Sequence, residues 1–276
     1  MGELSLASKK LIATLLKKVG IDNENVNVNE IMTRINRTEI ERILDGLSKL
    51  NIIDVKNGMI TKGKVYSERD KYLLFLNINK ICNASPKGDR ALRINFEATP
   101  LVNGVEERIH QSNRFNAEKT SRVIRFKKIN RKNLLDENKK GKGEWEKEVD
   151  PKLIKFRVTF DPPLEVGEII KYGFYTWDEK YFPLTMEELH KRYNMDYSME
   201  GITIGQPTYY VKITINLPWV PKNVKAEKVL VVTLDGPHEG VEIQSKHRLV
   251  VDRNKITLEL WQPDYGTYFL KWQPPE

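Results

Sequence analysis

Hydrophobic residues change their spacing once along this chain of 276 residues. Up to about residue 65 they recur every three or four positions, which is the spacing of one face of a helix. From Ala91 onward they alternate with polar residues, which is the period of a strand with one face in water. The pattern therefore predicts a helical N-terminal part followed by a largely antiparallel sheet.

The N-terminal part contains three predicted helices and a hairpin. An apolar stripe predicts a first helix over 7–19, and a shorter stripe predicts a second over 29–35. A third helix is expected over 38–50, because Thr38 as its cap and Glu41 three residues later have the residue types of a capping box. The Asn-Gly pair at 57–58 then favours a tight hairpin, since both residues tolerate positive φ.

This order of elements resembles the winged helix-turn-helix family, with the helix over 7–19 as the first helix and the hairpin as the wing. The resemblance implies that the helix over 38–50 enters the major groove of double-stranded DNA. Acidic residues on the same helix would repel phosphates, so docking onto a protein is the alternative for this module. The DNA contacts that the resemblance implies are Arg37, Thr38, Arg42 and Lys49 on the helix, and Lys56, Lys62 and Lys64 on the wing.

The C-terminal part reads as many short strands separated by Pro and Gly turns. This pattern is typical of a β-sandwich, with a barrel as the alternative. One helical insert is expected over 184–193, where the period returns to that of a helix. The clearest strands are expected around 91–97, 154–160, 209–217 and 256–260, and further ones near 122–129, 167–177, 227–235 and 247–252.

The segment from Asp264 to Tyr268 is similar to the Asp-x-Gly-x-Tyr motif of immunoglobulin-type domains. In that family the tyrosine hydroxyl bonds to the backbone and fixes a corner of the sandwich. Leu270 stands where the family has a disulfide cysteine, which puts the usual topology in doubt. The motif supports an immunoglobulin-like or jelly-roll sandwich and indicates nothing about activity.

The expected fold class is therefore α+β with more than one domain. We expect a winged-helix domain over 1–65, a connector over 66–90 and an antiparallel β-sandwich with one helical insert over 91–276. Within the connector, the apolar run 72–78 fits either a helix end or a strand.

The net charge of +8 is concentrated between Lys119 and Lys147, where eleven basic residues accompany four acidic ones. Such a cluster can attract phosphates or an acidic protein, although a solvated loop that keeps the protein soluble explains it equally well. The stretch 130–150 is polar enough to predict a mobile loop. The candidate phosphate contacts in this region are Arg122, Arg125, Lys127, Lys128, Arg131 and Lys132.

The sequence contains few of the patterns that carry catalysis or bind cofactors. Its four histidines lack metal-ligand spacing, and the single cysteine, Cys82, predicts a buried structural thiol in a reducing compartment. No run of apolar residues is long enough to cross a membrane. We therefore expect a cytoplasmic protein that is no enzyme and binds no metal or cofactor.

These observations combine into a prediction of function. We expect a non-enzymatic regulatory protein whose winged helix binds DNA and whose sandwich mediates homodimerisation or senses a partner. The alternative is a protein-interaction or adaptor module that uses both parts as docking surfaces.

Overall fold

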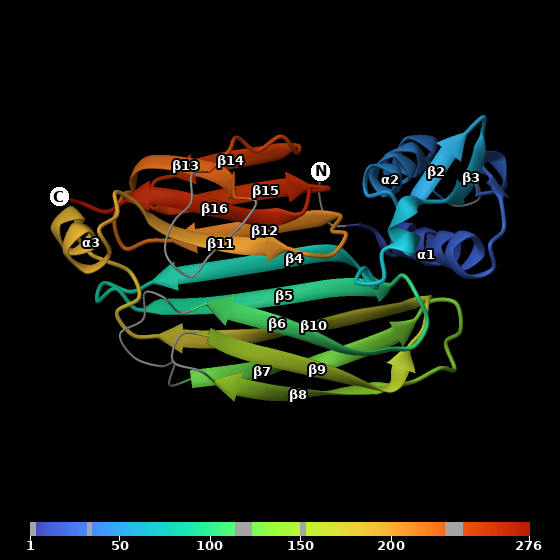
Figure 1. Ribbon diagram of the computed structural model, residues 1–276, viewed down its shortest axis with the longest axis horizontal. Coiled ribbons are helices and arrows are strands. Elements are labelled where there is room, and N and C mark those ends of the chain that lie inside the picture. The colour runs from blue at the N-terminus through green and yellow to red at the C-terminus, as the bar shows by residue number, and fades with distance from the viewer. Residues whose placement is uncertain (1–3, 32–34, 114–122, 150–152, 230–239) are drawn as a thin grey trace.

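A seven-stranded sheet forms the centre of the computed structural model, which describes residues 4–31, 35–113, 123–149, 153–229 and 240–276 (Figure 1). Neighbouring strands are antiparallel, except that β12 and β4 are parallel. In spatial order the strands are β14 (His247–Asp252), β15 (Lys255–Trp261), β12 (Tyr210–Asn216), β4 (Leu73–Ala84), β5 (Arg90–Pro100), β10 (Glu168–Asp178) and β7 (Val123–Asn133).

Two three-stranded sheets cover one face of this large sheet. Their side chains join one hydrophobic core with those of the large sheet; Phe156 stacks on Phe174, for example, with ring centroids 4.2 Å apart. The predicted helical insert is confirmed as α3 (Met186–Tyr193), which precedes β11. The first small sheet contains β6 (Val105–Asn113), β9 (Leu153–Leu164) and β8 (Lys142–Val149), and the second contains β11 (Ser198–Ile204), β16 (Gly266–Gln273) and β13 (Lys222–Val229).

The expected sandwich is wrong in its topology. An immunoglobulin-like or jelly-roll sandwich pairs two sheets of similar size, whereas here one large sheet carries two small ones and includes a parallel pair. Alternation correctly identified strands, but it does not specify which strands become neighbours. The Tyr268 hydroxyl does donate to the carbonyl of Asp264 at 2.9 Å, as the motif predicts, although it does so from the middle strand of a small sheet.

The predicted mobile loop over 130–150 is wrong for residues 130–133, which end β7, and for residues 142–149, which form β8. The strand has almost no apolar face, so its alternation is hidden in the sequence. Trp145 anchors it by stacking on Phe126 at 4.7 Å between ring centroids and by donating to the carbonyl of Lys127 at 3.1 Å. β8 lies at the edge of its sheet, where charged residues are tolerated on the exposed side.

The segment 4–67, called here the N-terminal unit, contains short helices and a small sheet of order β1-β3-β2. The Asn57-Gly58 hairpin is confirmed, with φ of 51° and 75° at these residues. The elements are α1 (Leu6–Leu15), the π-helical turn η1 (Leu16–Ile21), β1 (Val26–Asn27), the 3₁₀ turn η2 (Val28–Ile31), α2 (Arg37–Lys49), β2 (Ile53–Lys56), β3 (Met59–Lys62) and the 3₁₀ turn η3 (Lys64–Ser67).

The expected winged helix-turn-helix is not what these residues form. A helix-turn-helix needs two consecutive α-helices, but the described part of 29–35 contains only the end of the single 3₁₀ turn η2. The reason is that β1 pairs with β3 and the amide of Val28 donates to the carbonyl of Gly58, so this stretch is drawn into the sheet. Asn36, and not Thr38, caps α2 by accepting from the amide of Glu39.

The N-terminal unit lies at one end of the strands of the large sheet (Figure 1) and shares buried residues with the second face of that sheet. Leu76, Tyr210 and Trp261 of the large sheet share a hydrophobic cluster with the helices of the unit. A buried ion pair reinforces this contact, since Lys9 of α1 lies 3.0 Å from Glu97 of β5. The unit therefore covers one end of that face, and no other described segment covers the rest.

Gly46 of α2 is the point of closest approach between the unit and the sheet. A Cβ atom added there would lie 2.5 Å from the ring of Tyr209, which is 4% exposed. We expect Gly46→Ala to lower the free energy of unfolding by about 1–3 kcal/mol, because overpacking outweighs the gain in helix propensity. Chemical denaturation measures the loss. Gly205→Ala is the matched control, because nothing lies within 4 Å of its added Cβ. If Gly46→Ala were more stable than the wild-type protein, the Tyr209 ring would have moved aside without cost, and the prediction would be wrong.

Candidate ligand-binding face

The face of the large sheet opposite its core presents mainly polar side chains, in three rows that run across neighbouring strands from β14 toward β7. The register of the strands places these residues beside one another, so the rows follow directly from the pairing. We call these rows the open face. They are Arg248, Glu259, Lys212, Asn79, Asn95, Gly173 and Lys127; Val250, Thr257, Thr214, Ile81, Arg93, Tyr175 and Arg125; and Asp252, Lys255, Asn216, Asn83, Ala91 and Trp177.

Positive charge dominates the open face. Its carboxylates are Asp252 and Glu259, and Glu259 already accepts a 2.5 Å hydrogen bond from Tyr210. A polar sheet surface is ordinary wherever strands meet water. An excess of cations without counter-ions on such a surface is unusual. Arg93, Arg125, Lys127, Lys212 and Lys255 form no ion pair with the described residues. The six cations of the face are Arg93, Arg125, Lys127, Lys212, Arg248 and Lys255.

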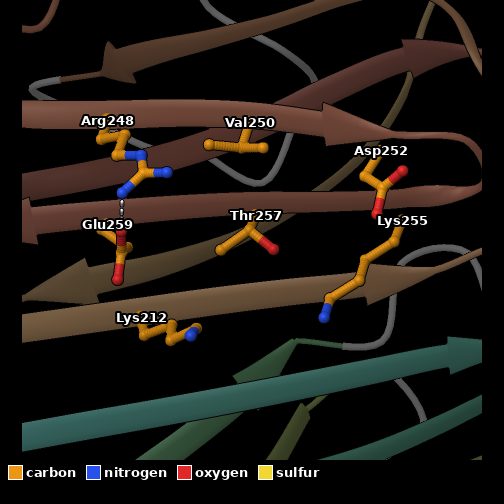
Figure 2. A pocket seen from close by; sticks show the side chains of 7 residues that line it. All are labelled: Lys212, Arg248, Val250, Asp252, Lys255, Thr257 and Glu259. Carbon is orange, nitrogen blue, oxygen red and sulfur yellow. Dashed lines mark ion pairs between the residues drawn. The ribbon is translucent and has the colours of Figure 1, made fainter.

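A shallow pocket of about 270 Å³ lies at the β12, β15 and β14 end of the open face. Figure 2 shows Thr257 between Lys212 and Lys255, with Asp252 beside Lys255 on the neighbouring strand. Arg248 and Glu259 lie at the other end of the pocket, 4.0 Å apart. The lining residues are Lys212, Arg248, Val250, Asp252, Lys255, Thr257 and Glu259.

The chemistry of this face suits a ligand with several anionic groups. Ammonium and guanidinium groups donate charge-assisted hydrogen bonds to carboxylates and phosphates. Asparagine and threonine side chains beside them can both donate and accept. Burial, reinforced by the hydrogen bond to Glu259, raises the pKa of Tyr210, so its hydroxyl keeps its proton and orients that carboxylate.

A second charged cluster lies on the core side of the same sheet and is closed to solvent. Arg90 donates to Asp178 at 2.7 Å and to Glu200 at 2.9 Å, and Lys80 donates to Glu200 at 2.5 Å. Burial would raise the pKa of Glu200, but Lys80 and Arg90 outweigh it and lower the pKa to about 2. Because all four groups are nearly inaccessible, the cluster holds β11 against β4, β5 and β10 and presents nothing to a ligand.

Cys82 lies beside this cluster, with its Sγ 4.0 Å from a carboxylate oxygen of Glu200. Burial, together with the neighbouring carboxylate, raises the pKa of the thiol, so it stays protonated. The prediction of a buried structural thiol is confirmed. Among the described residues, no group of three or more His, Cys, Asp or Glu side chains could hold a metal ion.

The residues expected on the helix and wing are mostly neutralised by local partners. Arg37 lies 2.8 Å from Glu41, and Lys49 lies 2.8 Å from Asp45. The other positions divide as follows: Arg42 faces Glu39 at 3.6 Å, Lys56 pairs with Asp54 at 2.6 Å, Lys62 donates to Asn23 at 3.1 Å, and Thr38 and Lys64 are exposed.

The basic residues expected after position 119 do not form one patch. Arg125 and Lys127 point onto the open face, whereas Arg131 is buried and paired with Glu168 through both carboxylate oxygens. Lys128 and Lys132 are exposed, and Arg122 lies outside the described residues. The structure therefore unites two of the predicted residues with four that we missed: Arg93, Lys212, Arg248 and Lys255.

The prediction of a DNA-binding regulator is wrong. Its reading helix is neutralised by ion pairs along the exposed side, and the helix that would precede it in the motif is a 3₁₀ turn.

No helix of the described chain is long and apolar enough to span a membrane.

Comparison with known proteins gives similarity to solved structures only. No family model and no curated protein matches the chain. A protein from Parabacteroides distasonis, proposed to be a protease, is 10% identical with a TM-score of 0.42, over 74% of this chain and 41% of that one. An M1 zinc metallopeptidase from Deinococcus radiodurans is 10% identical with a TM-score of 0.33, over 72% and 42%. Yeast LTA4 hydrolase bound to bestatin is 9% identical with a TM-score of 0.35, over 73% and 29%.

The similar solved structures are of peptidase and hydrolase type and not of the regulatory type expected from the sequence. This chain spans less than half the length of each of them. With TM-scores below 0.5, the likeness transfers neither an active site nor an activity to the chain.

Proposed function

We propose that the open face binds an acidic segment of a partner protein. The observation that carries this proposal is the set of six cations on one exposed sheet surface, five of which have no ion-pair partner among the described residues. Unpaired cations at this density repel one another, and an acidic partner would relieve that repulsion. A cytoplasmic location, in keeping with the free buried cysteine, belongs to the same proposal.

A polypeptide matches the face better than a phosphate backbone does. Asn79, Asn95 and Thr257 lie between the cations and can accept as well as donate hydrogen bonds. Peptide groups offer both partners, whereas phosphates only accept. Asp252 and Glu259 would also repel a uniformly charged nucleic acid at the pocket, while a peptide can place an amide or an ammonium group there.

The N-terminal unit has a different role in this proposal from the one expected from the sequence. It bounds the open face at one end, with Lys9 and Glu97 at the junction. In this proposal the expected division into 1–65, 66–90 and 91–276 serves only to say in which segment a variant lies. The expected connector over 66–90 contains β4, which is a central strand of the large sheet.

A titration with a labelled acidic peptide tests the proposal. A peptide of about ten residues alternating Glu and Ser, followed by fluorescence anisotropy, is expected to bind at low salt and to weaken as salt screens the face. The control is the same peptide with Gln in place of Glu. Equal binding of the two peptides would refute the proposal, as would tighter binding of a single-stranded oligonucleotide of the same charge.

A further inference from the structure

We infer that the acidic segment lies across the strands of the open face and not along them. This inference rests on the proposed function and concerns the path of the partner. Three features of the structure carry it: the distribution of the cations over the strands, the span of the sheet and the position of the N-terminal unit.

The cations are spread over many strands and seldom share one. β14 contributes Arg248, β15 contributes Lys255 and β12 contributes Lys212, while β5 contributes Arg93. Only β7, among the described strands of this sheet, carries two cations on the open face, Arg125 and Lys127. A segment running along a strand would therefore meet few cations, whereas a segment crossing the sheet can meet all six.

The span of the sheet fixes the length of such a segment. From β14 to β7 there are six steps between neighbouring strands, which at about 4.8 Å each amount to about 29 Å. An extended polypeptide advances about 3.3 Å per residue, so about nine residues reach from Arg248 to Lys127.

The N-terminal unit blocks a path that runs along the strands. Glu97 lies on the same face as Asn95, two residues farther along β5. At Glu97 the face is already occupied by α1, whose Lys9 is buried against the Glu97 carboxylate. Lys171 of β10 lies 3.1 Å from Glu97 as well, so its charge is engaged there. A segment following a strand in that direction would collide with the unit, while a segment crossing the strands would pass beside it.

The crossing path divides the site into two halves. The pocket half contains Lys212, Arg248 and Lys255, and the β7 half contains Arg125 and Lys127. A segment that reaches both halves gains from bivalent binding, because the second contact forms within the complex. A shorter segment with the same charge can occupy only one half.

The experiment holds the peptide charge constant and varies its reach. Peptides carry a pair of glutamates at each end, separated by Gly-Ser spacers of about one, five and nine residues, and their affinities are measured by fluorescence anisotropy. We expect affinity to rise by about tenfold once the spacer spans the sheet. In the Arg125→Gln/Lys127→Gln protein the rise should vanish, while the shortest peptide should bind as before.

The control protein is Lys17→Gln/Lys64→Gln, which loses the same charge from exposed positions of the N-terminal unit and should keep the rise. Affinity that does not depend on spacer length, or a rise that survives in the β7 variant, would overturn the crossing path while leaving the acidic partner in place. Absence of binding by every peptide would instead overturn the proposed function itself.

Discussion

Replacing Glu200 with glutamine is expected to lower the free energy of unfolding by about 3–5 kcal/mol, the cost of breaking a buried ion pair by removing one partner. Glu200 is 4% exposed and is the shared acceptor of Lys80 and Arg90. After the substitution, Asp178 alone would face two buried cations, and water cannot reach them to compensate. Chemical denaturation of the wild-type and variant proteins at neutral pH measures the loss.

Two further variants serve as controls for the Glu200→Gln result. Glu187→Gln on the exposed side of α3 changes the same charge and is expected to be nearly neutral. Adding Lys80→Met to Glu200→Gln removes one unpaired cation, so the double variant should be more stable than the sum of the single losses indicates. A loss below about 1 kcal/mol for Glu200→Gln would show that the cluster is solvated.

The same carboxyl predicts a pH dependence. Its pKa is lowered from 4.5 to about 2 in the folded protein by Lys80 and Arg90, against the opposing effect of burial. A carboxyl with a lowered folded pKa stabilises the protein above its unfolded pKa, and this contribution is lost as pH falls toward the folded value. Between 4.5 and 2 the wild-type protein should therefore lose stability more steeply than Glu200→Gln.

Reversing two charges at the middle of the open face is expected to weaken binding of the acidic peptide by about tenfold or more at low salt. In Arg93→Glu/Lys212→Glu, two attractive contacts become repulsive, and exposed pairs contribute about 0.2–1 kcal/mol each. Loss of attraction and gain of repulsion together amount to about 1–4 kcal/mol, and 1.4 kcal/mol is tenfold in affinity. Anisotropy titration measures the change.

The control for the reversal is Lys17→Glu/Lys64→Glu, which alters net charge equally away from the open face. It should retain most of the affinity, because a salt-screened charge acts over about 10 Å at 0.1 M salt. Equal weakening by both proteins would mean that the peptide responds to net charge and not to this face. Thermal unfolding of all variants checks that none has lost its fold.

The candidate site could be predicted from the sequence only in part. Arg125 and Lys127 stood out because they belong to a dense basic run. Arg93 and Lys212 did not, because each is an ordinary polar residue on the wet side of an alternating strand. Their significance comes from the pairing of β5 with β10 and of β12 with β4, which places them on one surface with the basic strand β7.

The buried cluster did leave a signal in the sequence. Lys80 has the same parity as Ile78 and Cys82, and Arg90 has the same parity as Leu92, so both charges stand at core positions. A charge at a core position is tolerated only with a partner, and this would have predicted a buried network. It would not have identified Glu200, which lies more than a hundred residues away.

Sequence alone determined the strands with a clear apolar face, the hairpin at Asn57-Gly58, the helix α3 and the buried thiol, because each depends on local periodicity or on one residue type. Tertiary structure decided the order of the strands, the 3₁₀ turn where a helix was expected, the strand β8 and the rows of the open face. The physical reason is that strand pairing depends on hydrogen bonds between segments far apart in the chain. The local sequence pattern determines on which face of a strand each side chain lies. Only the pairing of the strands determines which side chains lie beside it on that face.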